Sequence, residues 1–164
     1  MSEWVCLVVR HASAGDRDKW EGLDELRPLD DKGRRQAAAL VPVVTTFDIQ
    51  RLVSADVLRC VQTLEPSAEA SQLPIEQDHL LSEDGYWENP SAGLARFLSI
   101  AESGVATAIS SQGGLIPDVL ARALLVWGHT FADNLDTRKG AYWVLHLTDG
   151  PHSLVEIEKH PSPK

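Results

Sequence analysis

Short apolar runs rich in β-branched residues alternate with segments of helical periodicity along most of this chain of 164 residues. A run that is apolar at every position, such as residues 4–9, is typical of a strand buried on both faces of a sheet. Strands that alternate with helices in this way form parallel sheets with helices packed on both faces. The sequence therefore predicts a single α/β domain over residues 1–164, with three layers and a mostly parallel central sheet.

The positions of the apolar runs, the glycines and the prolines predict where each element lies. We expect strands over residues 4–9, 50–54, 73–77, 105–111, 141–148 and 153–158, and helices over 31–46, from Val57 onward, over 91–102 and over 116–127. The last two strands should form a hairpin around Asp149 and Gly150. Polar loops should occupy 12–30 and 79–90. Because proline lacks a backbone N–H and clashes with the preceding turn, Pro42 should kink or end the first helix.

Composition and charge limit the partners of the chain. The formal net charge is −9 and the acidic residues are spread along the sequence, so nucleic-acid binding, which needs clustered Lys and Arg, is not expected. The N-terminal apolar run has six residues and is followed at once by Arg10, which argues against a signal peptide or a membrane span. Cys6 and Cys60 show no CxxC spacing, which favours buried thiols in a cytoplasmic protein.

Polar residues follow the first expected strand at the sheet edge where ligands bind in folds of this kind. Arg10 and His11 come directly after that strand. A neutral imidazole can accept a phosphoryl group when one ring nitrogen is held by a hydrogen bond. An arginine beside it can bind two phosphate oxygens at once. The pair therefore indicates a site for a phosphorylated ligand.

Two other strand ends carry groups that fit an anion. If Asp56 caps the helix after the second strand, Arg59 lies in its first turn, where free backbone N–H groups also favour an anion. Gly113 and Gly114 follow the fourth strand, and glycines there let the backbone approach a ligand closely. Glu83, in the loop after the third strand, is a candidate proton donor to a leaving oxygen.

Taken together, these features resemble the histidine phosphatase superfamily, which includes phosphoglycerate mutases and SixA-type phosphohistidine phosphatases. The resemblance rests on Arg10-His11 after a strand, on Ser54, Arg59, Gln62 and Thr63 at the family's spacing, on RPLDDKGRRQA over 27–37, on Glu83, and on SQGGLI over 111–116. It implies a phosphoglycerate mutase-like fold and a phosphatase that needs no metal or cofactor. It also implies the roles: His11 as nucleophile, Arg10 and Arg59 on the phosphoryl oxygens, Glu83 as acid, and Ser13, Gln112 and Gly113 as substrate-binding residues.

One position departs from the family pattern. Where the family has a second histidine, in the form S-H-G-G-x-I, this chain has Gln112, whose amide can donate a hydrogen bond but carries no charge. Stabilisation of the transition state should therefore weaken. The same glutamine, with RPLD and RKG segments, is similar to the phosphatase-like domain joined to some MutT-type Nudix hydrolases, although this chain has no Nudix box and would stand alone. Lys139, before the fifth strand, is a candidate for restoring the charge.

Two alternatives are weighed against an active histidine phosphatase. The change to Gln112 leaves open a module that binds a phosphate ligand without useful turnover. A cysteine phosphatase would need an arginine six residues after the cysteine, which neither Cys6 nor Cys60 has, and Walker A, GxGxxG and histidine metal motifs are also absent from the sequence. The expected partner is thus a phosphorylated small molecule or a phosphoprotein, with protein phosphohistidine, a nucleotide and a small phosphometabolite as the candidate substrates.

Overall fold

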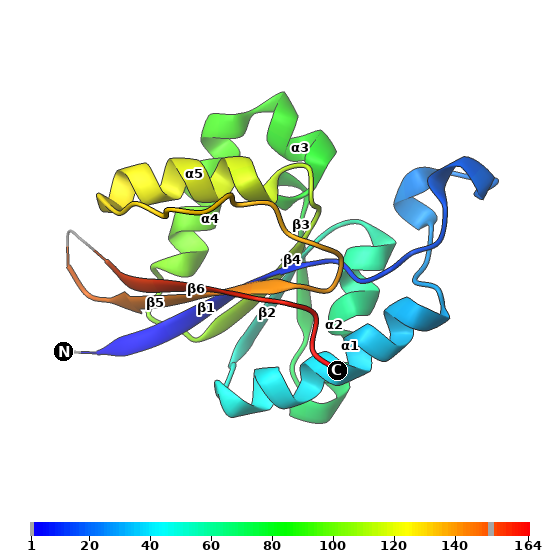
Figure 1. Cartoon of the computed structure of the whole chain (residues 1–164), viewed down its shortest axis with the longest axis horizontal. Helices are drawn as coiled ribbons and strands as arrows, with labels where there is room; N and C mark the ends of the chain where they lie inside the picture. The colour runs from blue at the N-terminus through cyan, green and yellow to red at the C-terminus, as the bar shows by residue number, and fades with distance from the viewer. Residues whose placement is uncertain (1, 151–152) are drawn as a thin grey trace.

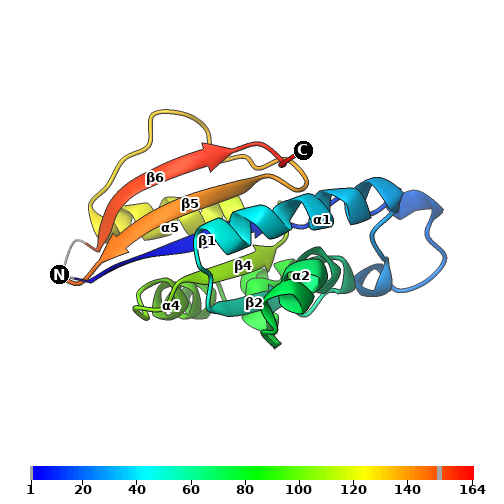
Figure 2. The same cartoon turned by 90° about the horizontal axis from the view of Figure 1, so that it is seen from below.

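The computed structural model describes residues 2–150 and 153–164, and its strands form a six-stranded sheet (Figure 1). The strands are β1 Glu3–Arg10, β2 Arg51–Ala55, β3 Ile75–Asp78, β4 Thr107–Ser111, β5 Tyr142–Thr148 and β6 Leu154–His160. Their order across the sheet is β3-β2-β4-β1-β5-β6, which Figure 2 shows from β6 to β2. β3, β2, β4 and β1 pair in parallel, and β5 pairs antiparallel with β1 and β6. The predicted α/β architecture with a mostly parallel sheet is confirmed.

Helices cover both faces of the sheet (Figure 1). One face carries α1 Asp31–Thr46 and α2 Leu58–Ser71, and the other carries α3 Glu83–Glu88, α4 Pro90–Ala101 and α5 Ile116–Trp127. On the first face, Leu40 and Leu64 pack in one core with Leu7. On the second face, Phe97 packs in another core with Val8. Because neighbouring residues of a strand point to opposite faces, β1 contributes to both cores and is fixed between them.

The segment 79–90 differs from the polar loop that the sequence predicts. It contains a 3-10 turn at His79–Leu81, followed by the helix α3. The Ser82 hydroxyl caps this helix by accepting the N–H of Gly85 at 3.1 Å, and Tyr86 of the same helix is fully buried. A helix of six residues is too short to show a clear helical period, so the polar composition misled the prediction. As a result, Glu83 is the first residue of a helix.

Two local features of α1 and α2 also bear on the expectations. α1 continues through Pro42 to Thr46, so the proline does not end the helix. Pro42 and Ala38 are both exposed, so water can reach the Ala38 carbonyl that loses its helical partner. The expectation that Asp56 caps α2 is wrong, because the capping residue is Val57 and the helix has no side-chain cap. The Asp56 carboxylate instead lies 3.0 Å from Nδ1 of His79.

Among residues 2–150 and 153–164, no helix combines the length and the apolar character needed to cross a bilayer. Cys6 and Cys60 are both free and fully buried, as the sequence predicts.

Candidate active site

A cavity of about 520 Å³ opens at the edge of the sheet where β1 and β4 end. Six of the site residues expected from the sequence line it, namely Arg10, His11, Arg59, Glu83, Gly113 and Lys139. Gly15, Asp16, Arg17 and Arg27 complete the wall, and the sequence analysis assigned no role to any of these four. Residues far apart in the chain therefore meet at one opening, because parallel strands bring their carboxyl ends to the same edge.

His11 is the residue on this wall whose geometry best suits a nucleophile. Its side chain is buried, with 5% of the residue exposed, and its Nδ1 lies 2.7 Å from the carbonyl oxygen of Ala12. A carbonyl can only accept, so Nδ1 carries the hydrogen and the Nε2 lone pair is free in the neutral ring. Burial lowers the pKa of His11 to about 3, against the Ala12 hydrogen bond, with the charges of Arg59, Arg10 and Lys139 adding to the lowering. The imidazole is therefore uncharged near neutral pH.

This pKa has a consequence for folding stability that a variant can reveal. The pKa of folded His11 is about 3, below the ordinary value of 6.5, so the folded protein holds fewer protons than the unfolded chain between these pH values. The stability that His11 contributes is present above pH 6.5 and is lost as the pH falls toward 3. We expect the free energy of unfolding, measured with urea at pH 7 and at about pH 4.5, to fall less in His11→Asn than in the wild type.

His79 gives the control for that measurement, because the sign of its shift is opposite. The nearby Asp56 carboxylate raises the pKa of His79 from 6.5. Its contribution is present below pH 6.5 and is lost as the pH rises through the folded value. His79→Asn should therefore make the protein slightly more sensitive to acid. An equal acid response of the wild type and His11→Asn would contradict the assignment of a buried, neutral His11.

Arg10 and Arg59 flank His11 and are held by different parts of the chain. Nη1 of Arg10 donates to the carbonyl of Thr137 at 2.8 Å. The Arg10 side chain packs on Gly113, where an added β-carbon would come within 2.5 Å of Cζ and Nε of Arg10, so this close approach requires glycine. Arg59 is almost fully buried, and its Nη1 and Nη2 donate to the backbone oxygen and the carboxylate of Asp24 at 2.8 and 3.0 Å. Two guanidinium groups are thus fixed in the cavity wall that also contains the imidazole.

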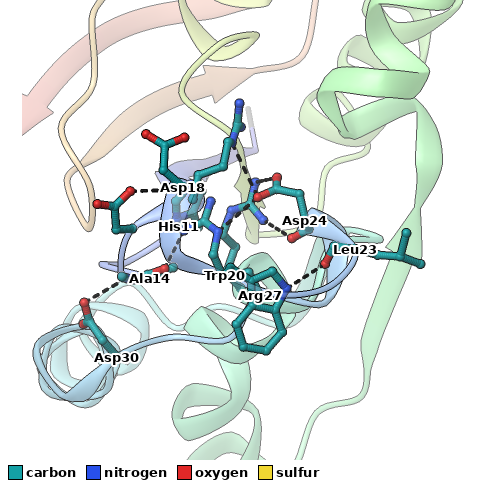
Figure 3. Close-up of polar contacts among 12 residues, drawn as sticks. His11, Ala14, Asp18, Trp20, Leu23, Asp24, Arg27 and Asp30 are labelled. Atoms are coloured by element: carbon teal, nitrogen blue, oxygen red, sulfur yellow. Dashed lines mark hydrogen bonds and ion pairs between the residues drawn. The ribbon is translucent and has the colours of Figure 1, made fainter.

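The loop over 12–30 contributes an ion network that its sequence does not predict (Figure 3). The carboxylate of Asp24 accepts from Nε of Arg27 at 3.0 Å and lies 3.5 Å from Nε of Arg17, in addition to its bond with Arg59. Arg27 also donates to the carbonyl of Ala14. Partial burial acts to raise the pKa of Asp24, but the Arg27 hydrogen bond and the charges of Arg59, Arg27 and Arg17 outweigh it and lower the pKa. One carboxylate therefore gathers three guanidinium groups at the cavity.

Two polar side chains of α2, Thr63 and Gln62, anchor the two ends of this loop. The Thr63 hydroxyl accepts the N–H of Ala12 at 2.9 Å and donates to the carbonyl of Arg59 at 2.7 Å. Oε1 of Gln62 accepts the N–H of Leu29 at 2.8 Å. The motif that places Arg59 in the wall therefore also holds the backbone that follows His11. Ser54 lies outside the wall, and its buried hydroxyl donates to the carbonyl of Ala55 at 2.8 Å.

Hydrogen bonds connect Glu83 with Gln112 and with Gly114. The backbone N–H of Glu83 donates to Oε1 of Gln112 at 2.7 Å, and Oε1 of Glu83 accepts the N–H of Gly114 at 2.9 Å. Gln112 is buried and, unlike Glu83, does not line the cavity. Its carbonyl therefore positions the backbone of Glu83.

Ser13 and Lys139 lie differently with respect to the cavity. The Ser13 hydroxyl donates to the Asp30 carboxylate at 2.8 Å, and Ser13 is not part of the wall. Lys139 lines the cavity and is exposed, and the N–H of the next residue, Gly140, lies 3.1 Å from the carbonyl oxygens of both Arg10 and His11. Lys139 therefore lies at the opening of the cavity. The Ser13 hydroxyl is used in a hydrogen bond within the loop over 12–30.

Other catalytic groups have little support among residues 2–150 and 153–164. No group of three or more His, Cys, Asp or Glu side chains with the proximity of a metal site occurs in these ranges. Burial raises the pKa of the Cys6 and Cys60 thiols to about 12, so both are protonated near neutral pH. A protonated, inaccessible thiol is a poor nucleophile.

Comparison with known proteins identifies the family of the chain. A sequence model described as the histidine phosphatase superfamily (branch 1) matches residues 6–96, which is more than half of the chain. The chain therefore belongs to the histidine phosphatase superfamily. It is also 40% identical over 148 residues to a Mycolicibacterium smegmatis protein named 8-oxo-(d)GTP phosphatase. That match covers 88% of this chain and 44% of the relative, so the chain spans less than half of the relative's length.

Solved structures agree with this assignment at the level of the fold. The histidine phosphatase SixA in complex with tungstate is similar with a TM-score of 0.68 and 18% identity, over 94% of this chain and 96% of that one. A putative phosphohistidine phosphatase SixA from Nakamurella multipartitia gives a TM-score of 0.69 and 19% identity, over 98% of each chain. The predicted phosphoglycerate mutase-like fold is confirmed. The fold and the family match therefore agree in placing the chain in the histidine phosphatase superfamily.

Proposed function

We propose that this chain hydrolyses phosphate esters or anhydrides through a phosphohistidine formed on His11. The observation that carries the proposal is the Nδ1 hydrogen bond to Ala12, which leaves the Nε2 lone pair free in a buried, neutral ring. Arg10 and Arg59 flank that ring in the same cavity. Fixed cations around a developing negative charge are a principal source of rate acceleration in phosphoryl transfer.

The reaction has two steps that use the same residues. In the first, Nε2 of His11 attacks phosphorus in line, a P–N bond forms, and the bond from phosphorus to the leaving oxygen breaks. Arg10 and Arg59 hold the phosphoryl oxygens, and Glu83 donates a proton to the leaving oxygen. In the second, Glu83 takes a proton from water, the water oxygen attacks phosphorus, and the P–N bond breaks to release phosphate and the neutral imidazole. The Gly114 N–H holds the Glu83 carboxylate at 2.9 Å for both transfers.

Lys139 supplies the charge that the family's second histidine would provide. It lies in the cavity wall, and its ammonium group is near enough to contribute to the lowered pKa of His11. We expect Lys139→Ala to lower kcat/KM for 4-nitrophenyl phosphate by about 10- to 100-fold. Lys32→Ala, on the exposed start of α1, is the matched control and should be within about twofold of the wild type.

Placing the family's histidine at position 112 is a second test of the role of Lys139. In the Lys139→Ala background, Gln112→His returns a group that can carry charge next to the cavity residue Glu83, and part of the lost activity should return. Full activity of Lys139→Ala alone would remove Lys139 from the mechanism.

Among the substrate classes expected from the sequence, a nucleotide has the most support. The Mycolicibacterium smegmatis relative carries the name 8-oxo-(d)GTP phosphatase and is 40% identical to this chain over the matched region. The cavity of about 520 Å³ also has a size typical of sites for small organic ligands. A nucleotide would place its transferred phosphoryl group at His11 and its remainder toward the opening.

The competing proposal is a module that binds a phosphate ligand without turnover, and it is favoured by the uncharged Gln112. Steady-state release of 4-nitrophenol, combined with alkaline quenching and mass spectrometry of the His11 peptide, separates the two. We expect turnover together with phosphorylation of His11 that disappears after acid treatment, because phosphohistidine is labile in acid. Binding of phosphate without turnover or phosphorylation would establish the binding module instead.

A further inference from the structure

We propose that the substrate carries a second phosphate group adjacent to the one transferred to His11, and that Arg17 and Arg27 bind it. The inference rests on the phosphatase reaction proposed above. It assigns a function to two residues of the cavity wall that this reaction does not use. The substrate class is thus an oligophosphate with a phosphoanhydride bond, such as a nucleoside diphosphate or triphosphate.

The number of cations at the cavity exceeds what one phosphoryl group needs. Four arginines and Lys139 line it, while the net charge of the whole chain is −9. Arg10, Arg59 and Lys139 suffice for the transferred group. The wall also contains the carboxylates of Asp16 and Glu83, and the Asp24 carboxylate lies against the arginines. Five cations against three carboxylates still leave the site positive.

Arg27 is the residue that most requires an explanation. Only 7% of it is exposed, and burial of a guanidinium group is costly unless its charge and its donors are used. Its Nε and Nη1 donate to Asp24 and Ala14. Within residues 2–150 and 153–164, no protein group accepts from Nη2, and Arg27 lines the cavity. This leaves a fixed N–H donor for a ligand.

The Asp24 carboxylate shows that the arginines can share an anion. Its Oδ2 lies 3.0 Å from Nη2 of Arg59, its Oδ1 lies 3.0 Å from Nε of Arg27, and the same Oδ1 lies 3.5 Å from Nε of Arg17. The two oxygens of a single carboxylate therefore reach an arginine that flanks His11 and both arginines of the loop. Two linked phosphates span more than one carboxylate, so an anhydride held at Arg59 can reach Arg17 and Arg27.

A second phosphate at this position also gives the reaction a suitable leaving group. Nε2 of His11 forms a bond to the terminal phosphorus, and the bond from that phosphorus to the bridging oxygen breaks. The bridging oxygen leaves with its electron pair, takes the proton of Glu83 and stays with the remaining phosphate, whose charge Arg17 and Arg27 stabilise. Water then cleaves the P–N bond and releases orthophosphate. Charge develops on the leaving phosphate during the first step, so these arginines act on the transition state as well as on binding.

The test compares two ligands that cannot be hydrolysed, so it does not depend on turnover. Binding of methylenediphosphonate and of methylphosphonate is measured by titration calorimetry, at one pH and one ionic strength, on the wild type and the variants. We expect the wild type to bind methylenediphosphonate at least about tenfold more tightly. In Arg17→Gln/Arg27→Gln this preference should fall to within about twofold, while the affinity for methylphosphonate is retained.

The variants are chosen so that loss of folding cannot be mistaken for loss of the subsite. Arg17→Gln alone changes a side chain that is 64% exposed, and it should remove part of the preference without affecting stability. Arg34→Gln, which breaks only an exposed pair with Asp31, should leave both affinities unchanged. Equal binding of the two ligands by the wild type, or a full preference in the double variant, would overturn the subsite. A preference for the diphosphonate without any turnover would leave the subsite intact and contradict only the proposed reaction.

Discussion

Replacement of His11 by asparagine should lower kcat for 4-nitrophenyl phosphate by at least about 10⁴-fold, since the nucleophile itself is lost. Asparagine has an amide N–H that can still donate to the Ala12 carbonyl, so the loop after β1 should keep its conformation. It has no ring nitrogen to form a bond with phosphorus. The arginines remain, so binding of orthophosphate should change far less than kcat. The measurement is a set of initial rates for release of 4-nitrophenol.

The matched control is His129→Asn, which changes a half-buried histidine in the loop after α5, outside the cavity wall. Its kcat should be within about twofold of the wild type. Urea unfolding of both variants at pH 7 shows whether each is folded. A kcat for His11→Asn within tenfold of the wild type would show that another group attacks phosphorus.

The substitution Gly33→Ala should destabilise the fold by about 3 kcal/mol or more. A β-carbon at position 33 would collide with the backbone carbonyl oxygen of Ser13. That oxygen accepts the N–H of Asp30 at 3.1 Å, and the Asp30 side chain accepts the N–H of Gly33 at 2.8 Å. The collision is therefore with a backbone segment fixed by hydrogen bonds. The free energy of unfolding from urea titration is the quantity to compare.

Gly22→Ala provides the control, because its new methyl group would meet only the Trp20 indole, at 3.3 Å. A side chain at the surface can turn aside, so the loss should stay below about 1 kcal/mol. Gly33→Ala should also lower phosphatase activity at temperatures where it is folded, since Ser13 is two residues from His11. A loss of stability similar to that of Gly22→Ala would show that α1 and the loop after β1 are packed less closely than described.

The sequence was sufficient to predict the sheet and the residues at its edge because both depend on local patterns. Residues 4–9 are apolar throughout, and this run becomes a strand buried on both faces. Once that strand is parallel to β4, Arg10 and Gly113 must lie near one another. The S-x4-R-x2-Q-T spacing likewise places Arg59 at the cavity and Thr63 behind it. Short-range periodicity and chain direction together determine this part of the site.

The loop over 12–30 could not be predicted in the same way. Its polar residues show no period, and the Asp24 network depends on contacts with Arg59, which lies 35 residues away in the chain. The one sequence signal was the RPL segment that begins at Arg27, and it indicated the family without indicating a contact. The helix α3 was missed for a related reason, since its six residues are too few to define a helical face.

One part of the cavity wall beside His11 comes from residues that follow the family-matching region in the chain. Thr137 accepts from Arg10, and the N–H of Gly140 lies within 3.1 Å of the carbonyls of Arg10 and His11, whereas the match to the family ends at residue 96. During synthesis, the ribosome therefore releases the nucleophile long before it releases the segment that fixes the neighbouring arginine. A nascent chain that ends before residue 137 should bind phosphate poorly. Phosphate binding should reach its full strength only when β5 joins the sheet.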